Sequence, residues 1–421
     1  MKIAHYFFLF LILIGCAKNP SSQALSSIQL IDRNGFTETI TASDRLNALD
    51  QSNYLDPQSY QKVTRTYRKD ALGKTRGYVT TYHPNGQLWQ YLETCEGRAF
   101  GNYREYFLSG QLRLDAQVIE GHGDVDAHSQ ETWLFDKKSY AWNEEGQLIA
   151  EIAYHKGYLD GLSIYYGPDG SIERTASYKR GLLDGRTSVY NEAKELVGFE
   201  NFLEGAPHGV TQYQGDHETP AYREHYDHGK LMEATYFDLT GLCIAEIRNG
   251  SGKKAVFDKG ALKQKITYQS GVVEGKVEVF NADGLLVSEY ELIDGKKHGE
   301  EWFYFSPKDK EQELRPKMCI NWYEDAIHGF VKTWYEDGTL ENEREMCQNK
   351  RHGHNFAWYR DGSLMLMEDY ENGLLKSGSY MKKGVKEPVS NVSEGFGVAT
   401  LHDESGFYLK SINYQKGRPV E

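Results

Sequence analysis

Histidine side chains could bind a metal, so their spacing is the first test of the chemistry of this chain. Four histidines directly precede a glycine at one recurring position: His208, His298, His328 and His352. If adjacent copies lie two β-strands apart, equivalent residues are about 9.6 Å from one another, whereas an imidazole nitrogen binds zinc at about 2 Å. One ion could not easily be shared, so these histidines are predicted to be polar turn residues.

Two smaller groups leave metal binding open as an alternative. His352 and His354 could point to one side of a strand, and Asp124, Asp126 and His128 could do the same within an insertion. A solvated loop explains both groups as well. We therefore expect no metal and no other cofactor.

The segment Asn249–Lys254 superficially suggests a phosphate-binding loop. The first glycine of such a loop would fall at Ile247, and Lys253 is followed by Lys254 where Ser or Thr would help to bind magnesium. The sequence also contains no serine-hydrolase elbow, no paired-histidine zinc helix and no complete calcium loop. These observations predict that the protein is not an enzyme.

Aromatic residues are the strongest binding candidates. Three tryptophans occupy corresponding positions towards the carboxyl end, each followed by another aromatic residue: Trp302-Phe303, Trp334-Tyr335 and Trp358-Tyr359. Adjacent residues of a strand face opposite ways, so aromatic side chains are expected on both faces of a sheet. One face can be core, whereas the other needs a partner, or a cover from an inserted loop or the carboxyl-terminal cap.

These residues belong to a unit of about 24 residues that recurs through most of the chain. Its glycine is found at Gly157, Gly181, Gly205 and Gly229, and in shorter or interrupted copies at Gly250, Gly271, Gly295 and Gly373. A fixed period of this size indicates a repeat array in which each copy completes the core of its neighbour.

Each copy predicts a β-hairpin. In one copy Gly161–Tyr166 is expected as a strand, Pro168-Asp169-Gly170 as a tight turn and Ser171–Tyr178 as the returning strand. Gly157 to Gly161 then reverses the chain again. The predicted fold is therefore all-β: an elongated antiparallel meander of about a dozen stacked hairpin repeats, closed by amino-terminal and carboxyl-terminal caps.

The copies also define the expected domains. We predict a signal peptide at 1–15, a lipidated amino terminus with linker and cap at 16–70, the repeat array at 71–385, and degenerate repeats that form a cap at 386–421. Insertions near 120–142 and 306–316 are expected to lengthen hairpin loops on the flank of the array.

The repeat pattern is Tyr-x-x-Gly-x-x-x-Gly-x-x-x-x-Tyr followed by Asp/Asn-Gly-x-Leu/Ile, and it resembles the MORN-repeat variant of bacterial proteins. Gly181–Tyr190 and Gly295–Asp337 carry the pattern clearly, and it covers roughly three quarters of the chain. The resemblance implies hairpin arrays used for protein or membrane association. Some bacterial members are described as antitoxins, a function that suits cytosolic chains better.

The first sixteen residues predict export and lipidation. Lys2 is followed by an apolar run from Tyr6 to Ile14, which is too short to span a membrane and fits a signal peptide. Leu13-Ile14-Gly15-Cys16 resembles the bacterial lipobox, which implies acylation of Cys16, with palmitate among the chains, and removal of residues 1–15. Several acyl chains give durable anchoring. Ala17 favours the outer membrane, by the sorting rule of enteric bacteria.

Net charge and cysteine spacing narrow the possible partners and crosslinks. The chain has a formal net charge of −13 at pH 7, which disfavours nucleic acid. Cys319 and Cys347 are expected two strands apart, at about 9.6 Å, beyond the roughly 7 Å limit for disulfide-bonded Cα atoms. We expect these two, Cys95 and Cys243 to be free thiols.

The sequence as a whole predicts an exported lipoprotein of the cell membrane or outer membrane, anchored through Cys16. Its repeat array would be a protein-binding or scaffold module, for a protein partner or for self-association. The candidate binding residues are Trp302, Phe303, Trp334, Tyr335, Trp358 and Tyr359. Recognition of a glycan or the cell wall is one alternative, because aromatic hairpin repeats also stack on sugar rings, and an antitoxin-like partner protein is another.

Overall fold

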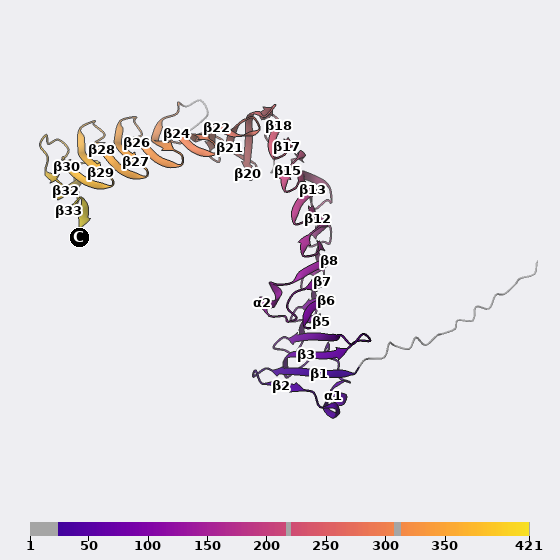
Figure 1. The fold of residues 1–421 in the computed structure, drawn as a ribbon. Helices are drawn as coiled ribbons and strands as arrows, with labels where there is room; N and C mark the ends of the chain where they lie inside the picture. The colour runs from indigo at the N-terminus through magenta and orange to yellow at the C-terminus, as the bar shows by residue number, and fades with distance from the viewer. Residues whose placement is uncertain (1–23, 216–219, 307–312, 421) are drawn as a thin grey trace, which may run out of the picture. The chain divides into compact units, whose positions relative to one another are not determined.

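A computed structural model of the chain describes residues 24–215, 220–306 and 313–420, and shows an all-β protein (Figure 1). Residues 1–23, which include Cys16, lie outside the described residues. Within the described ranges, 34 strands belong to one sheet and two short helices accompany them, α1 (Ser43–Leu49) and α2 (Ala127–Gln130). The predicted fold class is confirmed.

The strands group into two compact units, and the division falls within β13 (Leu182–Tyr190). The first unit contains β1 (Leu25–Asp32), β2 (Thr37–Ile40), β3 (Gln61–Lys69), β4 (Thr75–Tyr82), β5 (Leu88–Cys95), β6 (Arg98–Tyr106), β7 (Leu112–Glu120), β8 (Leu134–Trp142), β9 (Leu148–His155), β10 (Tyr158–Leu159), β11 (Gly161–Tyr166) and β12 (Ile172–Lys179).

The second unit contains the strands that follow β13. They are β14 (Leu196–Leu203), β15 (Ala206–Pro207), β16 (Gly209–Tyr213), β17 (Tyr222–Asp227), β18 (Lys230–Phe237), β19 (Cys243–Arg248), β20 (Ser251–Asp258), β21 (Ala261–Gln269), β22 (Val272–Phe280), β23 (Leu286–Ile293), β24 (Lys296–Tyr304), β25 (Pro316–Tyr323), β26 (Ala326–Trp334), β27 (Leu340–Cys347), β28 (Lys350–Trp358), β29 (Leu364–Glu371), β30 (Leu374–Tyr380), β31 (Ser390–Ser393), β32 (Phe396–His402), β33 (Tyr408–Gln415) and β34 (Arg418–Val420).

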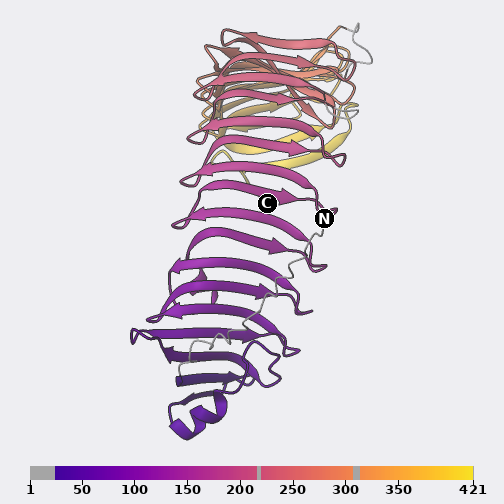
Figure 2. The same ribbon diagram turned by 90° about the vertical axis from the view of Figure 1, so that its right-hand side faces the viewer.

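Within each unit the strands pair antiparallel with their neighbours in the chain, as a meander requires. The amino-terminal end departs from this order, because β1 lies between β2 and β3. In the first unit the strands run side by side and the chain reverses at alternate edges of the sheet (Figure 2). Each two-strand repeat therefore places one turn at each edge of the sheet.

The turns at the two edges differ in backbone geometry. At the Asp-Gly turn only the glycine is left-handed: Gly170 has φ of 76°, and a register shift follows Tyr165 on the incoming strand. At the other edge both central residues are left-handed, as in Arg180 (φ 51°) and Gly181 (φ 84°). The first arrangement is a type I turn with a glycine bulge, and the second is the two-residue turn that matches the twist of the strands.

Along the edge of the sheet, these two-residue turns donate hydrogen bonds to the strand that follows the previous such turn, and we call this arrangement the turn ladder. The N–H of Gly181 donates to the carbonyl of Leu159 at 2.8 Å, and the N–H of Gly373 donates to Arg351 at 2.7 Å. The ladder continues where glycine is replaced, because Asn349 (φ 66°) donates to Ile327 at 3.0 Å. Each repeat is therefore tied to the previous one by its turn as well as by its strands.

The insertion between β7 and β8 packs on a face of the sheet rather than at its flank. Val125 and Trp133 are buried in a core cluster with Val79, Leu92 and Tyr103, and the Trp133 and Tyr103 rings meet edge to face at 4.6 Å. The expected flanking loop was thus wrong in position, because its apolar residues bury themselves on the sheet.

The amino-terminal cap combines strands with the short helix α1. Ile28 of β1, Ile40 of β2 and Leu46 of α1 form a separate buried cluster. These residues cover the end of the sheet, which limits edge-to-edge association.

The turn ladder generates a stability prediction at Gly373. A Cβ added there would meet nothing within 4 Å, so the backbone φ of 85° is the only source of strain. Gly373→Ala should lower the free energy of unfolding by about 1 kcal/mol, whereas Gly373→Asn should cost clearly less, because asparagine tolerates this conformation. Urea unfolding measures both. Gly167→Ala, at a glycine without positive φ, is the control, and equal stability of Gly373→Ala and wild type would contradict the prediction.

Candidate functional site

The candidate aromatic residues divide between the two faces of the second unit. One register row crosses six strands through Trp302, Cys319, Lys332, Glu343, Phe356 and Met367. Trp334 and Trp358 lie two residues further along β26 and β28. We call this surface, defined by Trp302, Trp334, Phe356 and Trp358, the tryptophan face.

The tryptophan face carries two stacked ring pairs. The Trp302 and Trp334 rings are 5.6 Å apart with an interplanar angle of 25°, and Phe356 and Trp358 are 5.8 Å apart at 27°. All four side chains are partly exposed, and none belongs to a hydrophobic core cluster of the described residues. Neighbouring Phe330 and Met367 are 38% and 44% exposed. The face is therefore an aromatic surface in contact with solvent.

Tyr335 and Tyr359 do not share the tryptophan face. Both are buried, with 9% and 0% of their surface exposed. The Tyr335 hydroxyl donates to the carbonyl of Trp358 at 2.9 Å, and the Tyr359 hydroxyl donates to that of Met381 at 2.9 Å. Each tyrosine therefore ties its repeat to the next one.

Phe303 also lies opposite the tryptophan face. It shares a side of β24 with Glu301, which is two residues away and buried. Only the three tryptophans of the six candidates share an accessible surface, which Phe356 extends. The alternation of side chains along the strand was predictable from the sequence. Which side faces solvent depends on which face of the sheet packs against the core.

Buried glutamates line the face opposite the tryptophans, and the sequence did not indicate them. Glu224 accepts hydrogen bonds from Tyr226 at 2.9 Å and Tyr236 at 2.5 Å, and pairs with Lys254 at 2.7 Å. Burial, together with the negative Glu224, raises the pKa of both tyrosines well above the usual range. The hydroxyls thus stay protonated and donating, which makes this network structural.

Equivalent glutamates recur further along the unit. Glu301 pairs with Lys297 at 2.7 Å and accepts the Trp322 indole N–H at 2.9 Å. Glu368 accepts from Asn355 at 2.6 Å and from Tyr380 at 2.8 Å. A glutamate two residues before a tyrosine or phenylalanine of the same strand is the sequence feature that could have identified this set.

Side chains at the recurring histidine position accept hydrogen bonds from the next two-residue turn. The N–H of His228 donates to His208 Nδ1 at 3.2 Å, and the N–H of Asn372 donates to His352 Nδ1 at 3.3 Å. Asp160 does the same for Arg180 at 3.1 Å. The predicted role as polar turn residues is confirmed for His208 and His352.

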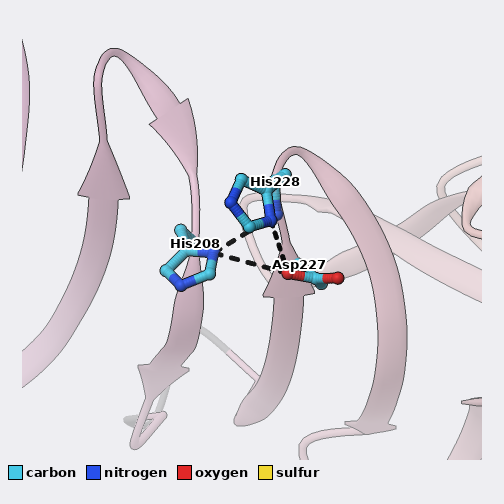
Figure 3. A group of neighbouring side chains, drawn as sticks. All are labelled: His208, Asp227 and His228. Carbon is cyan, nitrogen blue, oxygen red and sulfur yellow. Dashed lines mark hydrogen bonds and ion pairs between the residues drawn. The ribbon is translucent and has the colours of Figure 1, made fainter.

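One histidine pair does come close, and the comparison of equivalent positions missed it. His208 and His228 have ring centroids 4.7 Å apart, and Asp227 Oδ1 lies 2.6 Å from His228 Nδ1 and 3.7 Å from His208 Nδ1 (Figure 3). His228 occupies a turn rather than the recurring position. The three residues could offer ligands to one metal ion, but hydrogen bonds of the turn already engage Asp227 and His208 Nδ1.

Asp124, Asp126 and His128 do not form a metal-binding group. Asp124 pairs with Arg65 at 2.6 Å, Asp126 accepts the Ser129 N–H at 3.0 Å as the cap of α2, and His128 is exposed. His352 Nδ1 accepts the Asn372 N–H at 3.3 Å, and His354 Nδ1 lies 3.5 Å from Asp369 Oδ1, so each imidazole already contacts another group of the array.

The four described cysteines are free, as predicted. Cys319 lies in register with Trp302 on the strand between the two stacked tryptophans, and is 3% exposed. Burial, with a smaller contribution from Glu300, raises its pKa to about 11. We therefore expect the tryptophan stack to shield this thiol and to keep it unreactive.

Comparison with known proteins supports the repeat assignment. The family model described as MORN repeat variant matches residues 76–95, which cover β4 except for Thr75, the turn that follows it and β5. The chain therefore contains the repeat variant that its pattern indicates. A search of curated proteins found no match. No helix in the described ranges is both long enough and apolar enough to cross a membrane.

Two solved structures show limited similarity. A TcdB2-TccC3-TEV structure is 13% identical, with 91% of this chain and 22% of that chain covered and a TM-score of 0.16. A porin-like protein from Bacteroides uniformis is 10% identical, with 70% of this chain and 95% of that chain covered and a TM-score of 0.14. The chain thus spans about a fifth of the length of the first structure.

Shielding of Cys319 leads to a test of the tryptophan stack. At pH 8 a thiol reagent such as DTNB should react rapidly with exposed Cys243 and slowly with Cys319. Trp334→Ala should raise the Cys319 rate by at least tenfold, because it opens the stack above the thiol. The rate is measured by mass spectrometry of labelled peptides.

Trp358→Ala is the matched control, since it alters the other ring pair and should leave the Cys319 rate unchanged. Equal rates in wild type and Trp334→Ala would contradict the shielding.

The raised pKa of Cys319 also sets a pH dependence of stability. The contribution of the neutral Cys319 thiol to stability is present below about pH 9 and is lost as pH rises through about 11.

Proposed function

We propose that this chain is a lipid-anchored, non-enzymatic scaffold that binds a protein partner through its tryptophan face. The observation that carries the proposal is the set of four partly exposed aromatic side chains in two stacked pairs on one surface. Aromatic residues with a polar rim are characteristic of the centres of protein interfaces. MORN-type hairpin repeats are consistent with such a role.

The surroundings of the tryptophan face support a protein partner. Lys332 and Glu343 form an ion pair of 2.8 Å within the register row, and Lys332 Nζ lies 5.3 Å from the Phe330 ring centroid. Such a surface offers both apolar anchors and charged contacts. Because the chain has a net charge of −13, a partner with an apolar patch and a basic rim fits best.

The stacking geometry favours protein over sugar. In both pairs one aromatic ring lies over the other, so a ring face used in the stack is not open to a sugar ring. Exposed edges and partly covered faces suit the irregular apolar surface of a protein better. Glycan recognition therefore becomes an outcome of the test rather than a second proposal.

The anchor part of the proposal depends on Leu13-Ile14-Gly15-Cys16. Acylation of Cys16 would hold the array at the cell membrane or outer membrane, because several acyl chains bind a bilayer durably. A tethered repeat array would then present the tryptophan face to partners at that membrane.

Partner binding is tested by quantitative recovery from envelope extracts. Trp334→Ala should reduce recovery of a specifically bound protein by at least tenfold, as expected for a central aromatic contact. Trp89→Ala is the matched control, since Trp89 is 42% exposed and stacked on His83 in the first unit. The opposite outcome is that no protein partner is recovered, that the chain is retained on purified peptidoglycan, and that Trp334→Ala weakens this retention. That result would overturn the scaffold proposal in favour of glycan binding.

The anchor has an independent test. Cys16→Ala should prevent lipidation, so the precursor should stay uncleaved or leave the membrane fraction. Radiolabelled palmitate incorporation and fractionation measure this change. Cys243→Ala, at an exposed cysteine of the array, is the control, and unchanged fractionation of Cys16→Ala would refute the lipid anchor.

A further inference from the structure

The second unit contains a hollow that neither the repeat pattern nor the proposed scaffold function explains. It has a volume of about 480 Å³ and is lined by residues of β26–β29 together with β32 and β33. Leu366, Leu401 and Ile412 form an apolar part of its wall, while Arg344 and Arg351 supply positive charge. This volume lies within the usual range of small-ligand pockets.

Arg344 belongs to the inner side of β27. Its register partners are Val331 on β26 and Asn355 on β28, which are both buried. Its neighbours Glu343 and Glu345 lie on the other side of the strand. Glu343 pairs with Lys332 at 2.8 Å, and Glu345 accepts the His354 N–H at 3.0 Å. The adjacent carboxylates are therefore committed elsewhere.

Among the described residues Arg344 has no hydrogen-bond or ion-pair partner. Burial and the nearby positive charge of Arg351 lower the pKa of Arg344 below its usual range. The guanidinium remains protonated at neutral pH, because its ordinary pKa is far higher. A half-buried cation beside another cation is unfavourable without a counter-ion.

The other polar groups of the hollow do not supply that counter-ion. Arg351 donates to the Tyr370 hydroxyl at 2.9 Å and lies 5.1 Å from the ring centroid. Both Glu368 oxygens are occupied, by Asn355 and Tyr380. Glu341 also lines the hollow, but forms no ion pair with either arginine in the described structure. The guanidinium of Arg344 is thus left available to a ligand, while in formal charge the two carboxylates of the lining balance the two arginines.

A second unsatisfied group indicates what else the ligand carries. Asn342 Oδ1 is buried and accepts no hydrogen bond, although the amide nitrogen of Asn342 donates to Asn355 and to the Phe356 carbonyl. Asn342 lines the same hollow and lies two residues from Arg344 on β27. The hollow therefore combines two cations, two carboxylates that form no ion pair with them in the described structure, one free acceptor and an apolar wall.

We propose that this hollow binds an acylated α-amino acid end, either the carboxyl terminus of a peptide or a small N-acyl amino acid. Its carboxylate would lie between Arg344 and Arg351, its amide N–H would donate to Asn342 Oδ1, and its apolar side chain would contact Leu366, Leu401 and Ile412. Carboxylates suit guanidinium groups because both are planar and can form paired hydrogen bonds. Trp358 of the tryptophan face also lines this hollow, but the proposed ligand contacts do not involve it.

Calorimetric titration of the full chain tests the proposal with N-acetyl-L-leucine and N-acetyl-L-leucinamide. The acid should bind at least tenfold more tightly than the amide, because the amide lacks the charge. A tripeptide ending in leucine with a free carboxylate separates the two sources: tighter binding than N-acetyl-L-leucine assigns a peptide terminus, and weaker binding assigns the small molecule. Inorganic phosphate binding as tightly as the acid would overturn the assignment to a carboxylate.

Arg344→Met should weaken the acid at least tenfold, and Arg344→Lys should retain part of the binding. Arg315→Met is the control, because Arg315 bonds Glu336 outside the hollow and its loss should not change binding. Without ligand, Arg344→Met should raise Tm by roughly 2–4 °C, since an unpaired, desolvated cation is removed. The site would be refuted if the acid and the amide bound equally or if neither bound. It would also be refuted if Arg344→Met bound the acid as tightly as the wild type does.

Discussion

The left-handed two-residue turn is the constraint on which the rest of the array depends. Two successive residues with positive φ reverse the chain and direct an N–H towards the preceding repeat, as Gly373 does towards the Arg351 carbonyl. Glycine adopts this conformation at little cost, and Asn349 shows that asparagine also serves. Because the same bond recurs, the strands keep their register and each repeat presents the same side chains to the same face.

That register separates the two faces chemically. On the inner face, tyrosines and buried glutamates satisfy one another, as in the contacts of Glu224 with Tyr226 and Tyr236. On the opposite face the tryptophans stack in pairs and remain partly exposed. A repeated strand thus yields a closed polar network on one side and a partly exposed aromatic surface on the other, from residues adjacent in sequence.

Departures from the repeat create the features that distinguish individual parts of the chain. The insertion after β7 adds Val125 and Trp133 to the core, where a regular turn would leave the face open. Near the carboxyl end, β32 and β33 contribute to the hollow that contains Arg344 and Arg351. The unpaired guanidinium of Arg344 is tolerated there because other residues supply the packing that stabilises this part of the unit. Its charge is therefore available for a ligand.

The sequence by itself determined the hairpin repeat, the all-β class, the polar role of His208 and His352 and the free cysteines, because turn chemistry and strand spacing are local properties. It could not decide which side of β24–β28 faces solvent, so it could not separate the buried Tyr335 and Tyr359 from the exposed tryptophans. It also could not show that Arg344 lacks a partner or that His208 approaches His228. Those facts depend on how the sheet packs on itself and which side chains meet, and only the tertiary structure decided them.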